Sequence, residues 1–296
     1  TCALPISPTI VGAAYNDWFF WDGRKDSLWA QAIASMENPV EHDMTRGKIV
    51  EVIRKDRGHA RRYRALFGEL PAADDAEGVT RAVVNVAKSI AAYERQIRPG
   101  KSRFDRYAAA VSEGREPPPD GRLTLDEELG LRSFLRVQQS QCLRCHNGPL
   151  FSNGTFHNIG TQDRLTLDNE QGRLRGVEKV VSDEFNCLSK WSDAPKEACV
   201  ELAAARRGDK SLLGAFKAPT LRNVSKTGPY MHNGKIGNLE DVMWHYRTSR
   251  GGPLGQSALE SATLTGIEFD QIRAFLATLD ARPAGPARYL RAPGRR

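Results

Sequence analysis

The five residues Cys142-Leu143-Arg144-Cys145-His146 limit what this chain can be more than any other feature of its sequence. A Cys-x-x-Cys-His run is typical of c-type haem attachment, in which two thiols bond to the haem vinyl groups and the imidazole binds the iron. Two intervening residues let both thiols reach a vinyl group, while the same turn holds the histidine at the iron. The sequence therefore predicts one covalently bound haem c at Cys142, Cys145 and His146.

Two other kinds of site also use paired cysteines. A zinc site needs two more ligands with similar spacing, whereas Cys187 and Cys199 have about eleven residues between them and no paired histidine. A redox-active dithiol usually follows a strand, whereas a helical pattern precedes Cys142. The motif therefore favours haem over both alternatives.

Cys187 and Cys199 are instead a candidate disulfide. The bond would close a loop of about a dozen residues and stabilise the fold by about 3 kcal/mol in the chain-entropy treatment. The alternative is two free thiols. Covalent haem c together with a disulfide indicates an oxidising compartment outside the cytoplasm, most simply a bacterial periplasm.

Composition excludes two classes of protein. The 296 residues are 40% hydrophobic and 27% charged, which is typical of a globular chain with a sizeable core. No apolar run approaches the roughly 18 residues that would predict a membrane span. The net charge of +7 arises from Lys and Arg residues that look scattered and lack an aromatic-basic motif, so we expect no nucleic-acid binding. A basic surface would instead steer an acidic redox partner.

Apolar residues recur at helical spacing through most of the chain, which predicts an all-α fold. Helices are expected over 43–55, with Asp43 as N-cap, over 79–97 and over 123–139, the last leading directly to Cys142. Capping boxes are expected where Thr124 precedes Glu127 and where Thr265 precedes Glu268. The Pro-rich stretch 117–121 predicts a linker between an N-terminal domain, 8–116, and a C-terminal haem domain, 122–296.

The first seven residues are expected to be non-native. Thr1-Cys2-Ala3-Leu4-Pro5-Ile6 reads like one translated frame of a sequencing adapter, so residues 1–7 and Cys2 are left out of the fold argument. The chain also starts without Met or a signal peptide. We therefore expect a truncated chain whose natural start, with any targeting signal, lies upstream.

Several ordered motifs resemble those of bacterial dihaem cytochrome c peroxidases and their MauG-type relatives. The resemblance extends from Pro8 to Leu279. In chain order the motifs are Phe20-Trp21-Asp22-Gly23-Arg24, Gln31, Glu37-Asn38-Pro39-Val40-Glu41, Cys142-x-x-Cys145-His146-Asn147-Gly148-Pro149, Phe151-Ser152, Phe156-His157-Asn158-x-Gly160, Ala218-Pro219-Thr220-Leu221-Arg222-Asn223-Val224 and Gly228-Pro229-Tyr230-Met231-His232-Asn233-Gly234. The resemblance implies two cytochrome c-like domains with one haem each. The N-terminal domain is expected to be incomplete here, because its own attachment motif should precede Pro8.

The resemblance also assigns three residues to peroxide chemistry. Glu41 occupies the position of the acid-base group that moves protons between the peroxide oxygens, and Gln31 lies beside it. Trp21 matches the tryptophan that relays electrons between the two haems. Taken alone, Glu41 would be read as a solvated carboxylate, and Trp21 can pack in the core as well. This chain has Ser35 where the family commonly has Pro, so the peroxide pocket is expected to be tuned differently from that of its relatives.

The second axial ligand of the haem at His146 is expected to be Tyr246. Peroxidases of the family place Met at this position and MauG-type members place Tyr, which lowers the reduction potential. Met231, Met243 and His245 are the alternatives. A tyrosine ligand favours the MauG-type branch.

The resemblance implies a calcium ion between the domains as well, bound by the backbone carbonyls of Thr227 and Pro229 and by an upstream Asn. It further implies an oxidoreductase that reduces hydrogen peroxide with electrons from a small cytochrome c or a cupredoxin, in some cases as a homodimer. A MauG-type oxidase of a protein or organic substrate and a monohaem electron-transfer cytochrome are the alternatives. Without an N-terminal haem, the chain as given is expected to lack peroxidase turnover.

Overall fold

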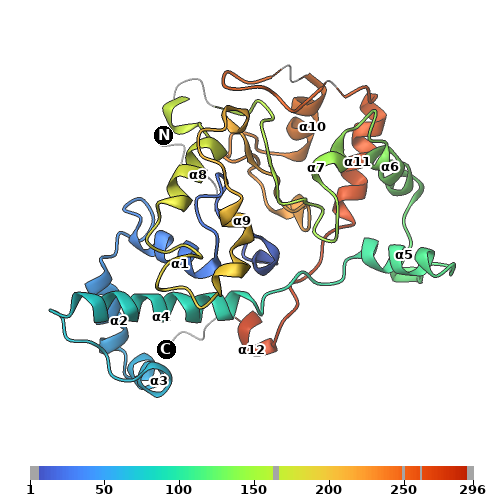
Figure 1. Cartoon of the computed structure of the whole chain (residues 1–296). Coiled ribbons are helices and arrows are strands. Elements are labelled where there is room, and N and C mark those ends of the chain that lie inside the picture. Colours follow the sequence, from blue (N-terminus) through green and yellow to red (C-terminus); the bar gives the residue numbers. More distant parts are fainter. Residues whose placement is uncertain (1–6, 163–166, 249–250, 261, 292–296) are drawn as a thin grey trace.

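The computed structural model describes residues 7–162, 167–248, 251–260 and 262–291, and they form a mainly helical fold with one two-stranded antiparallel sheet (Figure 1). Of the residues expected to be non-native, 1–6 lie outside the described ranges. Within those ranges, no helix has the length and apolar content that crossing a membrane requires. The helices are α1 (Leu28–Glu37), α2 (Arg46–Lys55), α3 (Arg57–Phe67), α4 (Ala76–Glu94), α5 (Arg103–Ser112), α6 (Leu125–Leu135), α7 (Cys142–Cys145), α8 (Arg173–Val181), α9 (Val200–Ala203), α10 (Leu239–Thr248), α11 (Gly266–Ala277) and α12 (Ala287–Leu290), and the strands are β1 (Phe156–His157) and β2 (Phe216–Lys217).

Side-chain caps fix where several helices begin. The capping boxes predicted at Thr124 and Thr265 are both present, at the starts of α6 and α11. The helix predicted from Asp43 begins instead at Arg46, because Thr45 caps it and accepts a hydrogen bond from the Lys48 amide at 3.3 Å. Asp43 itself has a positive φ of 49°, which a right-handed helix does not allow.

Two predicted helices have different ends in the structure. The helix expected over 79–97 runs from Ala76, capped by Asp75, and ends at Glu94. The helix expected over 123–139 ends at Leu135. The prediction that it leads directly to Cys142 is therefore wrong, because a loop separates α6 from the attachment motif.

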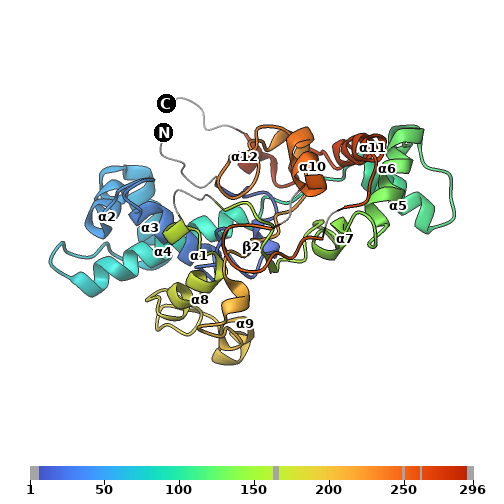
Figure 2. The same ribbon diagram turned by 90° about the horizontal axis from the view of Figure 1, so that it is seen from above.

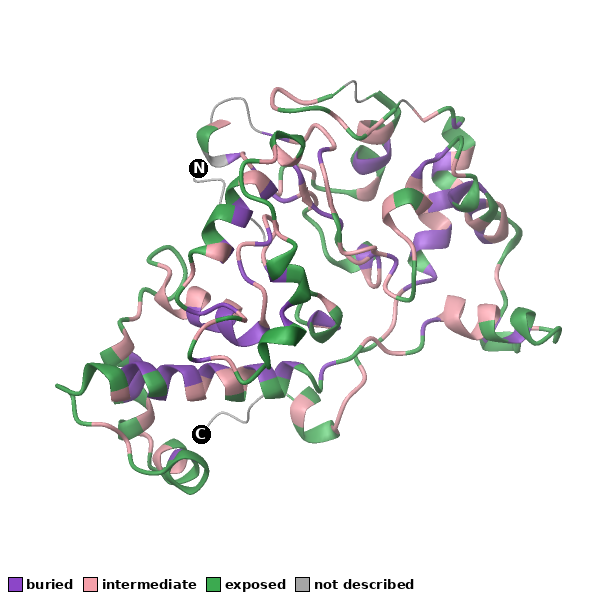
Figure 3. Ribbon diagram, viewed as in Figure 1, coloured by how far each residue is buried: buried purple, intermediate pink, exposed green. Residues whose placement is uncertain are grey.

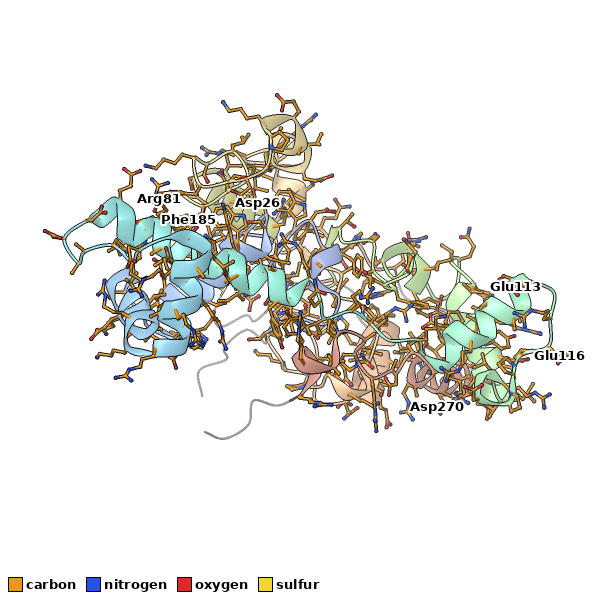
Figure 4. All side chains as sticks on the ribbon, turned by 90° about the horizontal axis from the view of Figure 1, so that it is seen from below. Asp26, Arg81, Glu113, Glu116, Phe185 and Asp270 are labelled. Atoms are coloured by element: carbon orange, nitrogen blue, oxygen red, sulfur yellow. A yellow bond between two sulfur atoms is a disulfide. The ribbon has the colours of Figure 1, made fainter. Side chains whose placement is uncertain are left out.

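The first hydrophobic core lies between α1 and α4, at the end of the molecule that also carries α2 and α3 (Figure 1). Ile33 of α1 and Val83 of α4 are fully buried in it. Phe185 and Trp191, which come from far along the chain, complete this core. In Figure 4, Phe185 lies at this end with Asp26 and Arg81, whereas Asp270 of α11 lies at the opposite end.

The second core lies between α6 and α11, where Figure 3 shows buried residues on both helices. The two helices approach closely at Gly130, because a Cβ there would lie 1.9 Å from the Gln271 carbonyl oxygen. Phe104 of α5 also packs here, with its ring centroid 5.4 Å from that of Phe275. Part of the predicted N-terminal domain therefore packs in the C-terminal core, and the division at 117–121 stays a prediction.

The segment between α8 and α9 contacts the N-terminal region through two ion pairs and a hydrogen bond. Asp183 pairs with Lys25, and Glu184 pairs with Arg46 of α2 at 2.8 Å. The Cys187 amide donates to Asp26 at 2.7 Å. A segment from the C-terminal half of the sequence therefore lies across the N-terminal core.

One pair of helices carries a local excess of positive charge. Residues 46–67, which form α2 and α3, hold eight Lys or Arg residues against two acidic ones, a net +6 of the chain's +7. Figures 1 and 2 both place this helix pair at the end of the molecule away from α6, α7 and α11. Eight of the 43 Lys and Arg residues are therefore gathered on one helix pair, and the other 35 are distributed over the rest of the chain, as expected.

Candidate functional site

The attachment motif forms a single helical turn, α7. Gln141 enters it with a positive φ of 60°, and the His146 amide closes it on the Cys142 carbonyl at 2.9 Å. The His146 Nδ1 donates to the Phe151 carbonyl at 3.0 Å, because a carbonyl can only accept. This bond leaves Nε2 free to bind a metal, as in other iron-bound histidines whose second nitrogen is fixed by a hydrogen bond.

Burial favours the neutral forms of the two cysteine thiols and of the histidine ring in the motif. It lowers the pKa of His146, although the hydrogen bond to Phe151 opposes this effect, and a neutral imidazole is the form that binds iron. Burial also raises the pKa of Cys142 to about 11 and raises that of Cys145. The motif therefore presents two uncharged thiols and one neutral imidazole.

All three residues line one cavity, which encloses about 1180 Å³ of space, part of it open to solvent. Its other walls come from α10, α11, β1, β2 and the loops beside them. They are mainly apolar and include Phe134, Phe216, Pro219, Leu221, Val224, Leu239, Val242, Met243, Leu259, Phe269, Ile272 and Leu276. The cavity is therefore suited to a large and mostly apolar group.

Tyr246 of α10 lies on the wall of the same cavity. Burial is the main cause that raises the pKa of its phenol, and the two motif cysteines add to this effect across the cavity. No hydrogen bond of its hydroxyl is found among the described residues. Met231 and Met243 line the cavity too, whereas the His245 Nε2 bonds to the Ile159 carbonyl at 2.8 Å. The structure therefore turns His245 away from this role and leaves the tyrosine and the two methionines.

The loop over 218–224 forms one side of the cavity and is fixed to the residues after the motif. The Ser152 hydroxyl donates to the Ala218 carbonyl at 2.7 Å, and the Thr220 hydroxyl donates to the Leu150 carbonyl at 2.6 Å. Arg222 pairs with both carboxylate oxygens of Asp105 in α5, at 2.8 and 2.9 Å. These contacts explain why two motifs distant in sequence belong to one site.

Trp21 lies on the cavity wall formed by β1 and β2. Its carbonyl accepts a hydrogen bond from the Lys217 amide at 2.8 Å. The structure therefore brings Trp21 to the site of the attachment motif.

Gln31 and Glu41 are not brought to this cavity. The side-chain amide of Gln31 donates a hydrogen bond to the Ser35 hydroxyl within α1 at 3.0 Å. Glu41 is exposed on the loop after α1, where it accepts a bond from Asn38 at 2.8 Å. No contact between the two is found among the described residues, so their shared role stays a prediction.

Cys187 and Cys199 are joined by a disulfide, with their Cα atoms 5.7 Å apart. Pro229 follows a cis peptide bond and lines a separate shallow hollow beside Thr227, which follows a short 3-10 turn. Within the described ranges, no group of three or more His, Cys, Asp and Glu residues is placed so that it could hold a metal ion. A site built from backbone carbonyls is not tested by that observation.

Two features of the cavity wall escaped sequence reasoning. The buried Lys217 directly precedes the quoted motif over 218–224, and that adjacency was its only signal. His232 is stacked on Phe216 with centroids 3.6 Å apart, and its Nε2 lies 2.5 Å from a carboxylate oxygen of the buried Glu170. Nothing local in the sequence pairs Glu170 with His232.

The residues present fit haem c. Two thiols spaced for the vinyl groups, an imidazole with its Nε2 free, a phenol and an apolar enclosure form a donor set that haem iron uses. A zinc site would need further ligands, and the described residues do not supply them.

The comparisons with known proteins agree with this chemistry. The family described as di-haem cytochrome c peroxidase matches residues 5–113. The methylamine utilization protein MauG of Methylorubrum extorquens is 29% identical over 281 residues, which are 94% of this chain and 65% of that protein. The cytochrome-c peroxidase IdrP2 of Pseudomonas sp. (strain SCT) is 30% identical over 280 residues, with 94% of this chain and 68% of that protein covered. The chain thus spans about two thirds of the length of these relatives.

Two solved structures share the fold. A MauG-like protein associated with microbial copper homeostasis has a TM-score of 0.62 at 22% identity, over 98% of this chain and 77% of that one. The diheme peroxidase BthA from Burkholderia thailandensis has a TM-score of 0.64 at 20% identity, over 92% and 67%. The relative that is 30% identical and covered over 68% of its length shows that this chain belongs to the di-haem cytochrome c peroxidase family, to which the MauG proteins are also related.

Proposed function

We propose that this chain is the larger part of a di-haem peroxidase that reduces hydrogen peroxide with electrons from a small cytochrome c or a cupredoxin. One observation carries the proposal: Trp21, from the N-terminal region, lies on the wall of the cavity that holds the attachment motif. An electron that arrives at this cavity therefore meets an aromatic side chain that leads towards the N-terminal region. A covalent haem and a disulfide favour the periplasm as the compartment.

Haem c bound in the cavity would supply reversible one-electron transfer. Cys142 and Cys145 would hold it covalently, while His146 and Tyr246 would bind the iron from the chain. The mainly apolar walls would contact the bound group and shield part of it from solvent. The chain's part is therefore to fix the cofactor and its ligands, which is how proteins tune such groups.

The second part of the proposal assigns proton delivery to Glu41. Reduction of hydrogen peroxide to two water molecules takes up two electrons and two protons. An exposed carboxyl can exchange protons with solvent and pass them on, and Glu41 is exposed and close in sequence to α1, which carries Gln31. We propose that the two residues face peroxide at the N-terminal haem.

Steady-state oxidation of a reduced small cytochrome c by hydrogen peroxide, with the full-length gene product, tests this assignment. Glu41→Gln should lower kcat by about 100-fold, because general acid-base groups contribute on that order. Asp43→Asn is the matched control, because Asp43 is also exposed two residues away and Asn tolerates its positive φ. Wild-type turnover in Glu41→Gln would reject Glu41 as the proton donor.

A second candidate is the oxidation of a protein or organic substrate, as the MauG-type alternative implies. It is supported by Tyr246, which lines the cavity and occupies the position where the resemblance places the second iron ligand. The two candidates differ in the electron source: a peroxidase consumes a reduced cytochrome, whereas an oxidase consumes the organic substrate. A monohaem carrier would show neither reaction.

Calcium at the carbonyls of Thr227 and Pro229 completes the proposal, because oxygen ligands suit this ion. Chelation of calcium should lower the Tm, and added calcium but not magnesium should restore it. An unchanged Tm would remove calcium from the account. A homodimer is the proposed assembly, and the mass in solution tests it.

A further inference from the structure

The segment that carries Trp21 is a tight loop. The Phe19 amide donates to the Lys25 carbonyl at 2.8 Å and closes the loop. Phe20 and Gly23 both have positive φ, of 63° and 67°, and for Phe20 this conformation costs free energy. Contacts with the rest of the fold must therefore hold Trp21 in place.

Lys217 of β2 holds the loop from the cavity side. Its backbone amide donates to the Trp21 carbonyl at 2.8 Å, and its Nζ donates to the Trp18 carbonyl at 2.7 Å. The residue is only 8% exposed and lines the haem cavity. One residue therefore fixes both ends of the Trp18–Trp21 segment.

Arg173 of α8 also holds the loop. Its Nη1 donates to the Gly23 carbonyl at 2.6 Å, and its guanidinium lies 3.8 Å from the Trp18 ring centroid and 4.3 Å from that of Phe156. It is 4% exposed. Two buried cations thus donate hydrogen bonds to carbonyls at the start of this segment and within its loop.

These cations are costly to bury. Burial lowers the pKa of Lys217 to about 8 and that of Arg173 to about 10, although more distant carboxylates, led by Asp17 for Lys217 and by Asp22 for Arg173, oppose the shifts. Among the described residues, neither cation has a carboxylate at ion-pair distance. A neutral donor could hold the same carbonyls without the desolvation cost of a charge. The charge itself therefore needs an explanation.

We propose that Lys217 is a positioning residue for Trp21 and that its positive charge raises the reduction potential of the haem bound in the adjacent cavity. A cation at the cavity wall stabilises the reduced iron, which carries one positive charge less. This effect opposes the lowering expected from a tyrosine ligand. The inference rests on the proposed haem site and on the proposed relay through Trp21.

The test uses the haem-loaded chain with Lys217→Met and, as a matched control, Lys210→Met, which removes an exposed lysine seven residues earlier. Spectroelectrochemical titration should show a lower haem potential in Lys217→Met and no change in Lys210→Met. Amide hydrogen exchange should become about tenfold faster over 18–25 in Lys217→Met, because a buried hydrogen bond to the Trp18 carbonyl is lost. An unchanged potential and unchanged exchange in Lys217→Met would overturn the proposal.

A second variant separates charge from positioning and guards against a Lys217→Met chain that does not fold. Lys217→Gln keeps a donor for the Trp18 carbonyl but removes the charge, so it should lower the haem potential while exchange over 18–25 stays near the wild-type rate. A wild-type potential in this variant would reject the electrostatic role. Neither readout needs peroxide turnover. If Trp21→Phe retained full turnover in the full-length protein, the relay would fail, whereas the effects of Lys217 would stand.

Discussion

The C-terminal cavity and the N-terminal peroxide residues differ in how completely the structure assembles them. The attachment motif, Tyr246 and Trp21 come from three separate segments and meet around one cavity. Gln31 and Glu41 stay apart, and Glu41 is exposed. The attachment motif lies in closely packed surroundings, and residue types and spacing in the sequence were enough to predict the residues that meet there. Gln31 and Glu41 were assigned by family position alone, and the structure does not bring these two residues together.

The largest effect on stability is expected from a substitution in the second core, between α6 and α11, which packs beside the cavity. Phe275 is fully buried and its ring lies against those of Phe104, Phe134 and Phe151. Phe275→Ala should lower the free energy of unfolding by about 4 kcal/mol, because it leaves a cavity among three rings. Urea unfolding measures this loss.

The control for that variant is Leu135→Ala in α6, which removes a side chain that is 48% exposed. It should change the free energy of unfolding by less than about 1 kcal/mol. If both variants cost the same, the rings would not form the support of the cavity.

Removal of the disulfide should have the next largest effect, and at the other end of the molecule. Cys187→Ser with Cys199→Ser should cost about 3 kcal/mol under oxidising conditions. Because the loop they close carries Trp191 into the first core, and Phe185 of the same core lies two residues before Cys187, amide exchange should rise in α1 and α4 more than in α6 and α11. Faster exchange in α6 and α11 instead would mean that the segment does not support the N-terminal core.

The smallest expected effect is a pH dependence at α11. Hydrogen bonds lower the pKa of Glu268 to about 2, from the usual 4.5. The bond from the Thr265 backbone amide has the largest effect, and the bond from Arg136 follows. A lowered pKa adds stability above about pH 4.5 that is lost as the pH falls towards 2. Glu268→Gln should flatten this loss by less than about 1 kcal/mol in urea unfolding between those pH values, because the group is near the surface. An unchanged slope would show that the cap does not couple to folding.

Local signals in the sequence were sufficient for part of this fold. The capping boxes at Thr124 and Thr265 depend on residues three positions apart, so they could be read directly. The haem motif is local in the same sense. Such features need no knowledge of the tertiary structure.

Features that depend on distant contacts could not be read in this way. The end of α6 at Leu135 has no Gly or Pro to mark it, and the loop that follows is held by Gln141, which donates to the Glu260 carbonyl at 2.8 Å. Lys217 acts on Trp18 and Trp21, about 200 residues earlier in the chain. No window of the sequence contains both partners of these contacts.

The central claim is that His146 and Tyr246 bind the iron of one covalent haem in this cavity. Absorption and electron paramagnetic resonance spectra of the haem-loaded chain test it most directly, with Tyr246→Phe compared with Met243→Leu. We predict that Tyr246→Phe changes the spectra and raises the reduction potential, because a phenolate ligand is lost, while Met243→Leu leaves the ligand-dependent features unchanged. Identical spectra for Tyr246→Phe and the wild type, with a change in Met243→Leu, would contradict the account and identify methionine as the ligand.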